Sequence, residues 1–384
     1  MLLILNYHSV SDDPCWLPGT PRNSVSPELF EAQLKWLQHN GYRSIFISEA
    51  GEILRSPSMV SSRERTVALT FDDGYADNWM AAHPLLEKRG MKATIFVSTD
   101  FVEDSSLKRK KINEADRRNL EWRGYLNWAE IRAMEESGLV EVQSHGRSHT
   151  RVFADDSLKG FFLPATAGRH WLLWNEDREN KHRWYDDRGV KSKLWGHPLW
   201  TMKPALANRA YLPDRERLGC FMELMNSRGE DFFYRKNCVG TLEREWSECA
   251  GRKRDSSRME SEREYDERVM DELLGSRLIL EKKIGRKVEY LCWPENAYSP
   301  RAERLAREAG YRGTVSNMYP RMNQPDPAGA RLARTFVGSR FFGVNSLSCD
   351  RLGFIMQCRR FEGNRAVYPL LAPGYLIQKI SRDS

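Results

Sequence analysis

Short runs of β-forming residues alternate with helical segments over much of this chain. The runs expected to form strands are residues 2–7, 44–47, 66–71, 93–97, 139–143, 288–292, 313–316 and 334–337. A helix is expected at 27–39, where Ser26 can cap the first turn and Gly41 can end the element. Such alternation favours a parallel sheet covered by helices.

Two adjacent carboxylates follow the run at 66–71. Asp72 and Asp73 stand between this run and Gly74, and the C-terminal ends of parallel strands are where α/β proteins gather catalytic side chains. Taken alone, two acids after a strand are more often a solvated turn or a helix cap. The interpretation of Asp72 and Asp73 as catalytic residues therefore needs support from a second cluster.

Two histidines four residues apart provide that support. His145 and His149 follow the run at 139–143. A lone pair with this spacing is weak evidence, because it can lie on an exposed surface and bind nothing. One carboxylate with two imidazoles makes a metal site, however, and a second carboxylate beside the cation stays ionised and can accept a proton from water. The two clusters together indicate a hydrolytic metal site.

The residues around both clusters resemble the polysaccharide deacetylase family (NodB homology, carbohydrate esterase family four). Residues 68–78 are similar to the family's first motif, and 145–149 to its second. Four further segments agree with the family in order and spacing: 84–97, 126–141, 288–294 and 309–315. The resemblance covers roughly residues 1–152 and 262–340. It implies a distorted (β/α)7 barrel of the NodB-homology type with a large insertion.

The resemblance also implies an active site. Asp73, His145 and His149 would bind one divalent metal ion, with Zn²⁺ the expected metal, and Asp72 would be the general base. Two imidazoles and one carboxylate leave open coordination positions for a water and an acetamide carbonyl oxygen. The implied reaction removes acetyl from an N-acetylhexosamine of a cell-surface glycan or its precursor.

The chain departs from the commonest family pattern in its general acid. The family usually takes this acid from a histidine near the C-terminus, but no histidine follows His197 here. Residues 3–10 resemble the opening of the biofilm poly-N-acetylglucosamine deacetylase branch, whose barrel is circularly permuted. His8 is therefore the expected acid, and the alternative is a histidine held structurally at a strand end.

The third motif departs as well. Cys292 stands where the family has an arginine that contacts the base. Arg334 resembles an arginine on a later strand of the permuted branch, and is expected either to orient Asp72 or to form a salt bridge at the rim. Glu295 replaces the family's tyrosine, and its backbone N–H is a candidate oxyanion donor. Trp293 is a candidate for binding or orienting the substrate.

Residues 153–261 interrupt the strand–helix rhythm and divide the expected barrel into 1–152 and 262–384. This insertion contains tryptophans among many charged residues, without a clear period. One hypothesis is a substrate lid in which Trp195 and Trp200 stack on sugar rings. The other is a subdomain whose tryptophans form a small core of their own, and the sequence leaves both open.

The composition and charge of the chain indicate which classes of partner and which cellular location to expect. The formal charge of +7 comes from 60 basic and 53 acidic residues in mixed order, so nucleic-acid binding is not implied, although peripheral contact with an anionic membrane remains open. No apolar stretch is long enough for a transmembrane helix, and residues 1–8 make a poor signal peptide. Seven cysteines without close pairing indicate reduced thiols, and hence a cytoplasmic protein acting on a nucleotide- or lipid-linked precursor.

Two other functions compete with deacetylation. A deformylase or another C–N amide hydrolase could use the same site. A catalytically silent glycan-binding protein could keep the fold, and Cys292 in the arginine position is the best support for it. Its main difficulty is that every expected metal ligand, base and acid is present.

Overall fold

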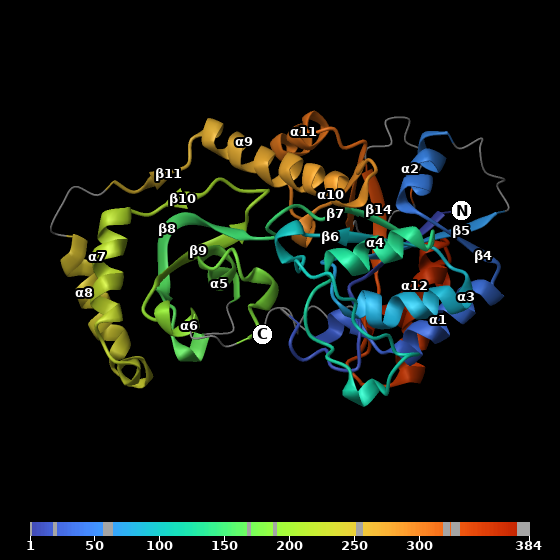
Figure 1. Cartoon of the computed structure of the whole chain (residues 1–384), viewed down its shortest axis with the longest axis horizontal. Helices are drawn as coiled ribbons and strands as arrows, with labels where there is room; N and C mark the ends of the chain where they lie inside the picture. Colours follow the sequence, from blue (N-terminus) through green and yellow to red (C-terminus); the bar gives the residue numbers. More distant parts are fainter. Residues whose placement is uncertain are drawn as a thin grey trace. The chain divides into compact units, whose positions relative to one another are not determined.

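The computed structural model describes residues 2–17, 21–56, 64–166, 170–186, 190–250, 256–317, 323 and 331–374 (Figure 1). The chain forms two compact units. The first unit comprises Met1–Arg147, Leu274–Asn296 and Ala306–Ser384, and the second comprises Ser148–Leu273 and Ala297–Leu305. The insertion expected at 153–261 lies within the second unit.

Seven parallel strands close into a barrel in the first unit. Around the ring they are β1 (Leu2–Tyr7), β14 (Arg331–Phe336), β13 (Gly313–Asn317), β12 (Tyr290–Cys292), β7 (Val140–Ser144), β6 (Ala93–Val97) and β5 (Arg65–Phe71). The ring closes because β5 pairs with β1 as well as with β6. An eighth strand, β4 (Tyr42–Ile45), pairs with β5 outside the ring. The expected (β/α)7 barrel is confirmed.

The register between β1 and β5 determines where the functional side chains emerge. Leu2 pairs with Thr66 and Tyr7 with Phe71, so both strands end at the same level. All six residues of β1 are buried, as expected for a parallel strand covered on both faces. The amide of Asp72 extends the pairing by donating to the carbonyl of Tyr7 at 3.0 Å. His8 and Asp72 therefore leave the sheet side by side.

Helices of the first unit follow the strands along the chain. They are α1 (Pro27–His39), α2 (Ile47–Arg55), α3 (His83–Arg89), α4 (Trp128–Glu136), α10 (Ser276–Ile284) and α12 (Leu347–Phe361). Ser26 caps α1 by accepting from the amide of Leu29, and Asn127 forms a capping box with Glu130 at α4. The Ser26 cap was predicted, because a capping signal is local and does not depend on the tertiary fold. Helix α11 (Pro300–Glu308) follows β12 along the chain.

The second unit combines two small antiparallel sheets with helices. Strand β8 (Arg151–Phe161) pairs with β9 (Pro198–Pro204), and β10 (Tyr211–Leu212) pairs with β11 (Arg258–Met259). Its helices are α5 (His170–Glu176), α6 (Val190–Lys193), α7 (Arg215–Asn226), α8 (Cys238–Ala250) and α9 (Glu262–Met270).

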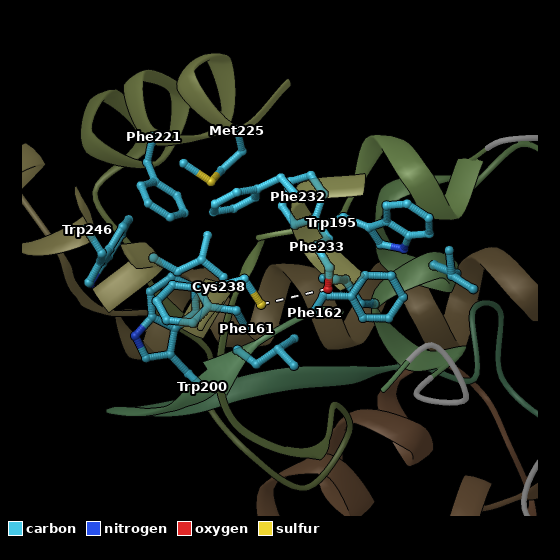
Figure 2. Packing of buried hydrophobic residues seen from close by; sticks show 14 residues of the cluster. Phe161, Phe162, Trp195, Trp200, Phe221, Met225, Phe232, Phe233, Cys238 and Trp246 are labelled. Atoms are coloured by element: carbon cyan, nitrogen blue, oxygen red, sulfur yellow. Dashed lines mark hydrogen bonds between the residues drawn. The ribbon is translucent and has the colours of Figure 1, made fainter. Parts of the chain in front are cut away.

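The tryptophans of the second unit form part of its hydrophobic core. Trp195 and Trp200 are only 8% and 5% exposed, and they pack in one cluster with Phe221, Phe233 and Trp246 (Figure 2). Side chains this deeply buried do not present a face to a sugar ring. The structure therefore corrects the expectation that Trp195 and Trp200 stack on substrate, and supports a subdomain with its own core.

Candidate active site

The candidate base and acid lie together at the carboxyl ends of β1 and β5. The Nε2 atom of His8 is 3.9 Å from Oδ2 of Asp72. Asp72 is almost completely buried, whereas 17% of the His8 side chain remains exposed. The pair therefore combines a shielded carboxylate with an imidazole that solvent can reach.

Arg334 on β14 binds the candidate base with both of its terminal nitrogens. Its Nη1 donates to Oδ1 of Asp72 at 2.7 Å, and its Nη2 donates to Oδ2 at 2.5 Å. Arg334 is 1% exposed, so this is a buried bidentate pair and not a salt bridge at the rim. Burial raises the pKa of Asp72, but the charges of Arg334, His145 and His8 and the Arg334 hydrogen bonds together lower it by more, so the carboxyl pKa lies below its ordinary value.

Cys292 leaves space for this pairing. Its Sγ atom accepts from Nη2 of Arg334 at 2.9 Å, and Nη1 also donates to Thr70 at 3.1 Å. The short thiol side chain stands where the resembled family has a long arginine. An arginine from β14 contacts the base in its place, so the departure at Cys292 does not leave Asp72 without a cationic partner.

The second aspartate points toward the first histidine. Asp73 lies in the left-handed region, with φ of 69°, and Gly74 follows with φ of 73°. Oδ1 of Asp73 is 3.3 Å from Nε2 of His145. Nδ1 of His145 donates to the carbonyl of Cys292 at 2.9 Å, because a carbonyl oxygen can only accept. This bond fixes the tautomer and leaves Nε2 as the ligand atom, as is usual for histidines that bind metal.

His149 follows the point at which the chain enters the second unit, between Arg147 and Ser148. Its backbone is left-handed, with φ of 43°. Within that unit its ring stacks on Trp171, with the ring centroids 5.9 Å apart and the planes inclined by 10°. The guanidinium of Arg151 lies 4.6 Å from the Trp171 ring centroid. The His149 imidazole therefore packs against a tryptophan that is itself in contact with Arg151.

Two groups of side chains among the described residues could hold a metal ion, and their chemistry separates them. The ligand atoms of Asp72, His145 and Cys292 lie within 4.8 Å of one another. The guanidinium of Arg334 already contacts two of these three side chains and neutralises the Asp72 carboxylate, so a second cation there would be repelled by the guanidinium. The other group is Asp73, His145 and His149. Its carboxylate and two imidazoles suit a zinc-type ion.

Two polar residues that the sequence reasoning missed hold the backbone on both sides of His8. Asp77 is fully buried and accepts from Oγ of Ser9 at 2.6 Å and from the amide of Val10 at 3.0 Å. Nδ2 of Asn78 donates to the carbonyl of His8 at 3.0 Å. Burial raises the pKa of Asp77 to about 6, against the hydrogen bonds it accepts. The sequence signal was their place in the motif at 68–78, four and five residues after Asp73.

The environment of His8 disfavours its charged form. Burial lowers its pKa, and the charges of Asp72 and Asp73 raise it by less, so the imidazole pKa lies below its ordinary value of 6.5. The ring also makes an edge contact with Phe336, with centroids 5.8 Å apart.

The remaining candidates of the third motif lie just after β12. Trp293 is 1% exposed, so its indole packs inside the barrel unit, and the expectation that it binds substrate is corrected. Glu295 has a left-handed backbone, with φ of 53°. Such a conformation in a non-glycine residue is often found at functional turns, and the Glu295 amide stays a candidate donor.

Parts of this chain are similar to known proteins. Residues 60–177 match the polysaccharide deacetylase family. The chain is 45% identical over 98 residues to the putative polysaccharide deacetylase YxkH of Bacillus subtilis (strain 168), covering 25% of this chain and 31% of that protein. It is 27% identical over 233 residues to the poly-β-1,6-N-acetyl-D-glucosamine N-deacetylase of Escherichia coli (strain K12), covering 60% of this chain and 33% of that protein. The matches thus span about a third of these relatives.

Two solved structures share the fold. A de-N-acetylase from Aggregatibacter actinomycetemcomitans aligns with a TM-score of 0.51 and 19% identity, covering 87% of this chain and 93% of that one. The BpsB deacetylase domain from Bordetella bronchiseptica gives the same TM-score and identity, covering 87% and 95%. The barrel therefore has the fold of the NodB-homology type, and residues 60–177 are similar to the polysaccharide deacetylase family. The similarity to the poly-β-1,6-N-acetyl-D-glucosamine N-deacetylase of Escherichia coli agrees with the resemblance to the biofilm branch that residues 3–10 suggested.

No helix in the described parts of the chain is both long enough and apolar enough to cross a membrane.

Proposed function

We propose that this protein is a metal-dependent carbohydrate N-deacetylase acting on an N-acetylhexosamine of a cell-surface glycan or its precursor. The proposal rests on one observation. At the carboxyl ends of β1 and β5, the carboxylate of Asp72, which Arg334 binds, lies beside His8 and next to the candidate ligand Asp73. A base and an acid at one rim, beside candidate ligands for a divalent ion, are the groups that amide hydrolysis needs.

The ion would be held by Asp73, His145 and His149, and when bound it would act as a Lewis acid toward the acetamide carbonyl. Asp72 would accept the proton of the attacking water. Arg334 occupies one lone pair on each of its oxygens, and the remaining lone pairs can take that proton. Arg334 also lowers the pKa of the Asp72 carboxyl, so the base is already ionised on the acidic side of neutrality, where His8 is protonated.

His8 would complete the reaction. The oxygen of water bonds to the carbonyl carbon, the C–N bond breaks, and the imidazolium of His8 protonates the departing amine, giving acetate and a free amino sugar. Asp77 and Asn78 support this role because they hold Ser9, Val10 and the His8 carbonyl, which fixes the imidazole near the base.

Substrate selection would lie in the second unit. Trp171 is the tryptophan of this unit that is partly exposed and also contacts the ring of His149. Aromatic rings bind the apolar faces of sugars well. We expect Trp171→Ala to raise KM with kcat little changed, and Trp171→Phe to restore KM. A fall in kcat alone would remove Trp171 from the binding role.

The substrate would be a nucleotide- or lipid-linked precursor in the cytoplasm. Seven cysteines without close pairing in the sequence are typical of a protein in a reducing compartment. Cell fractionation with thiol labelling would test the location, and extracellular recovery with oxidised cysteines would contradict it.

Acetate release is the direct test. Purified protein would be incubated with acetylated sugars, sugar nucleotides, lipid-linked sugars and oligosaccharides, each with several divalent metals added after chelation. Activity should require metal and should be lost in His145→Ala. The metal affinity of this variant should fall by far more than the 10–100-fold that is typical when a residue contacting a metal ligand is changed. Release from formylated but not acetylated sugars would favour a deformylase. Sugar binding without release under any condition would favour the silent glycan-binding protein.

A further inference from the structure

The C-terminal part of the first unit exposes an unusual amount of apolar surface. Eleven large hydrophobic side chains are exposed among the described residues, and five of these lie within residues 344–370. They are Val344, Leu347, Leu352, Tyr368 and Leu370, with exposures between 43% and 59%. Scattered exposed leucines need no explanation, but a local concentration usually marks an interaction surface.

Buried residues before, within and after α12 pack against one another in the segment that carries these side chains. Phe341 before α12, Met356 within α12 and Leu371 after it bury one another in a small cluster. On α12 the exposed residues Leu347, Arg351 and Leu352 lie in the first two turns, and Phe354 and Phe361 farther along the helix are buried. We call the exposed surface formed by Val344, Leu347, Arg351, Leu352, Tyr368 and Leu370 the α12 face.

Most charged residues of the segment that forms the α12 face are positive. Residues 337–374 contain five arginines and two acids: Arg340, Arg351, Arg359, Arg360, Arg365, Asp350 and Glu362. Both acids are engaged inside the fold. Asp350 is buried and accepts from the amide of Phe341 at 3.0 Å, and Glu362 accepts from Arg359 at 3.0 Å. The exposed arginines therefore outweigh the exposed acids at this surface.

We infer that the α12 face binds the surface of an anionic lipid membrane. A helix that presents leucines interspersed with arginines to solvent has the composition of an interfacial element, whose apolar side chains enter the headgroup boundary while its cations pair with lipid phosphates. The whole-chain formal charge of +7 adds long-range attraction to such a surface. This binding does not depend on catalysis, so its test is independent of the deacetylase proposal.

Sedimentation of the full chain with lipid vesicles tests the inference. The protein should bind vesicles of phosphatidylcholine mixed with phosphatidylglycerol, should bind pure phosphatidylcholine much more weakly, and should be released by high salt. Replacing Arg351 and Arg365 with glutamine should weaken binding about 20–30-fold, because each basic residue near an anionic surface contributes about fivefold. Leu347→Gln with Leu352→Gln should weaken it about tenfold or more.

A matched control uses exposed leucines elsewhere. Leu224 and Leu278 are 39% and 54% exposed, and changing both to glutamine should leave vesicle binding unchanged. Since all these side chains are exposed, the variants should keep the unfolding temperature, and Arg365→Gln alone serves if a double variant is unstable. Equal binding to neutral vesicles, or undiminished binding by both α12 variants, would overturn the inference. A dimer in light scattering that the leucine variant dissociates would instead show that a second copy covers the face.

Discussion

The pairing of Arg334 with Asp72 makes a quantitative prediction about stability. Both side chains are nearly inaccessible, at 1% and 4% exposure, and two hydrogen bonds of 2.5–2.7 Å join them. Arg334→Met leaves an ionised carboxylate buried without its cation. Breaking a buried ion pair in this way costs about 3–5 kcal/mol. The same cost applies to Asp72→Asn, which leaves the guanidinium unpaired. The double variant, Arg334→Met with Asp72→Asn, should regain much of the lost stability.

Hydrogen exchange of the metal-free protein measures this cost within the barrel alone. Peptides covering β5 and β14 report opening of the first unit separately from the second. Their slowest amides should exchange about 10²–10⁴-fold faster in Arg334→Met, as 3–5 kcal/mol implies. Arg312→Met is the matched control, because Arg312 pairs with Glu52 at 2.8 Å but both are more than 40% exposed. That pair should contribute about 0–1 kcal/mol.

Two results would refute the reasoning. Arg334→Met could exchange no faster than Arg312→Met, which would mean that water or a rearranged neighbour solvates Asp72. Alternatively, the double variant could lose as much as the two single variants combined. The coupling energy of the cycle would then be absent, and the two side chains would stabilise the barrel independently.

Three further predictions concern the catalytic roles. Asp72→Asn should keep its metal in elemental analysis, but its kcat should fall about 10²–10⁴-fold. Asp73→Asn should lose both the metal and the activity. Equal metal loss in the two variants would mean that the roles of base and ligand are shared or reversed. His8→Ala should keep metal and lose the basic limb of the pH–kcat/KM profile, and in the unmodified enzyme that limb should lie below pH 6.5, because burial lowers the pKa of the acid. Asp77→Ala should lower kcat and shift this limb with metal retained, and an unshifted limb would reduce Asp77 to a structural role.

Local and periodic signals made the barrel predictable. The run at 66–71 has no polar alternation, so it reads as a strand buried on both faces, and β5 occupies Arg65–Phe71. The strand expected at 44–47 is displaced, since β4 covers Tyr42–Ile45 and Ile47 already begins α2. Boundaries of this kind depend on pairing with β5, which the segment's own residues do not specify.

The residues alone indicated the candidate site where a motif is continuous in sequence, whereas His8 and Arg334 were expected only from the family resemblance. Asp72 with Asp73, and His145 with His149, each follow a single strand. The pairing of Arg334 with Asp72 joins residues 262 positions apart, and it depends on how the ring closes. The burial of Trp195 depends on the second unit's tertiary packing, because tryptophans among charged residues suit both a sugar-binding surface and a small core.

Closure of the barrel by its first strand has a consequence for biosynthesis. β1 lies between β5 and β14, which follow it by about sixty and more than three hundred residues. While the chain emerges from the ribosome, one edge of β1 has no partner until β14 has been made, and an unpaired strand edge is prone to aggregation. The strand that covers this edge also delivers Arg334. An incomplete chain would therefore lack both a closed sheet and an oriented base, so the proposed activity can begin only after β14 has been synthesised.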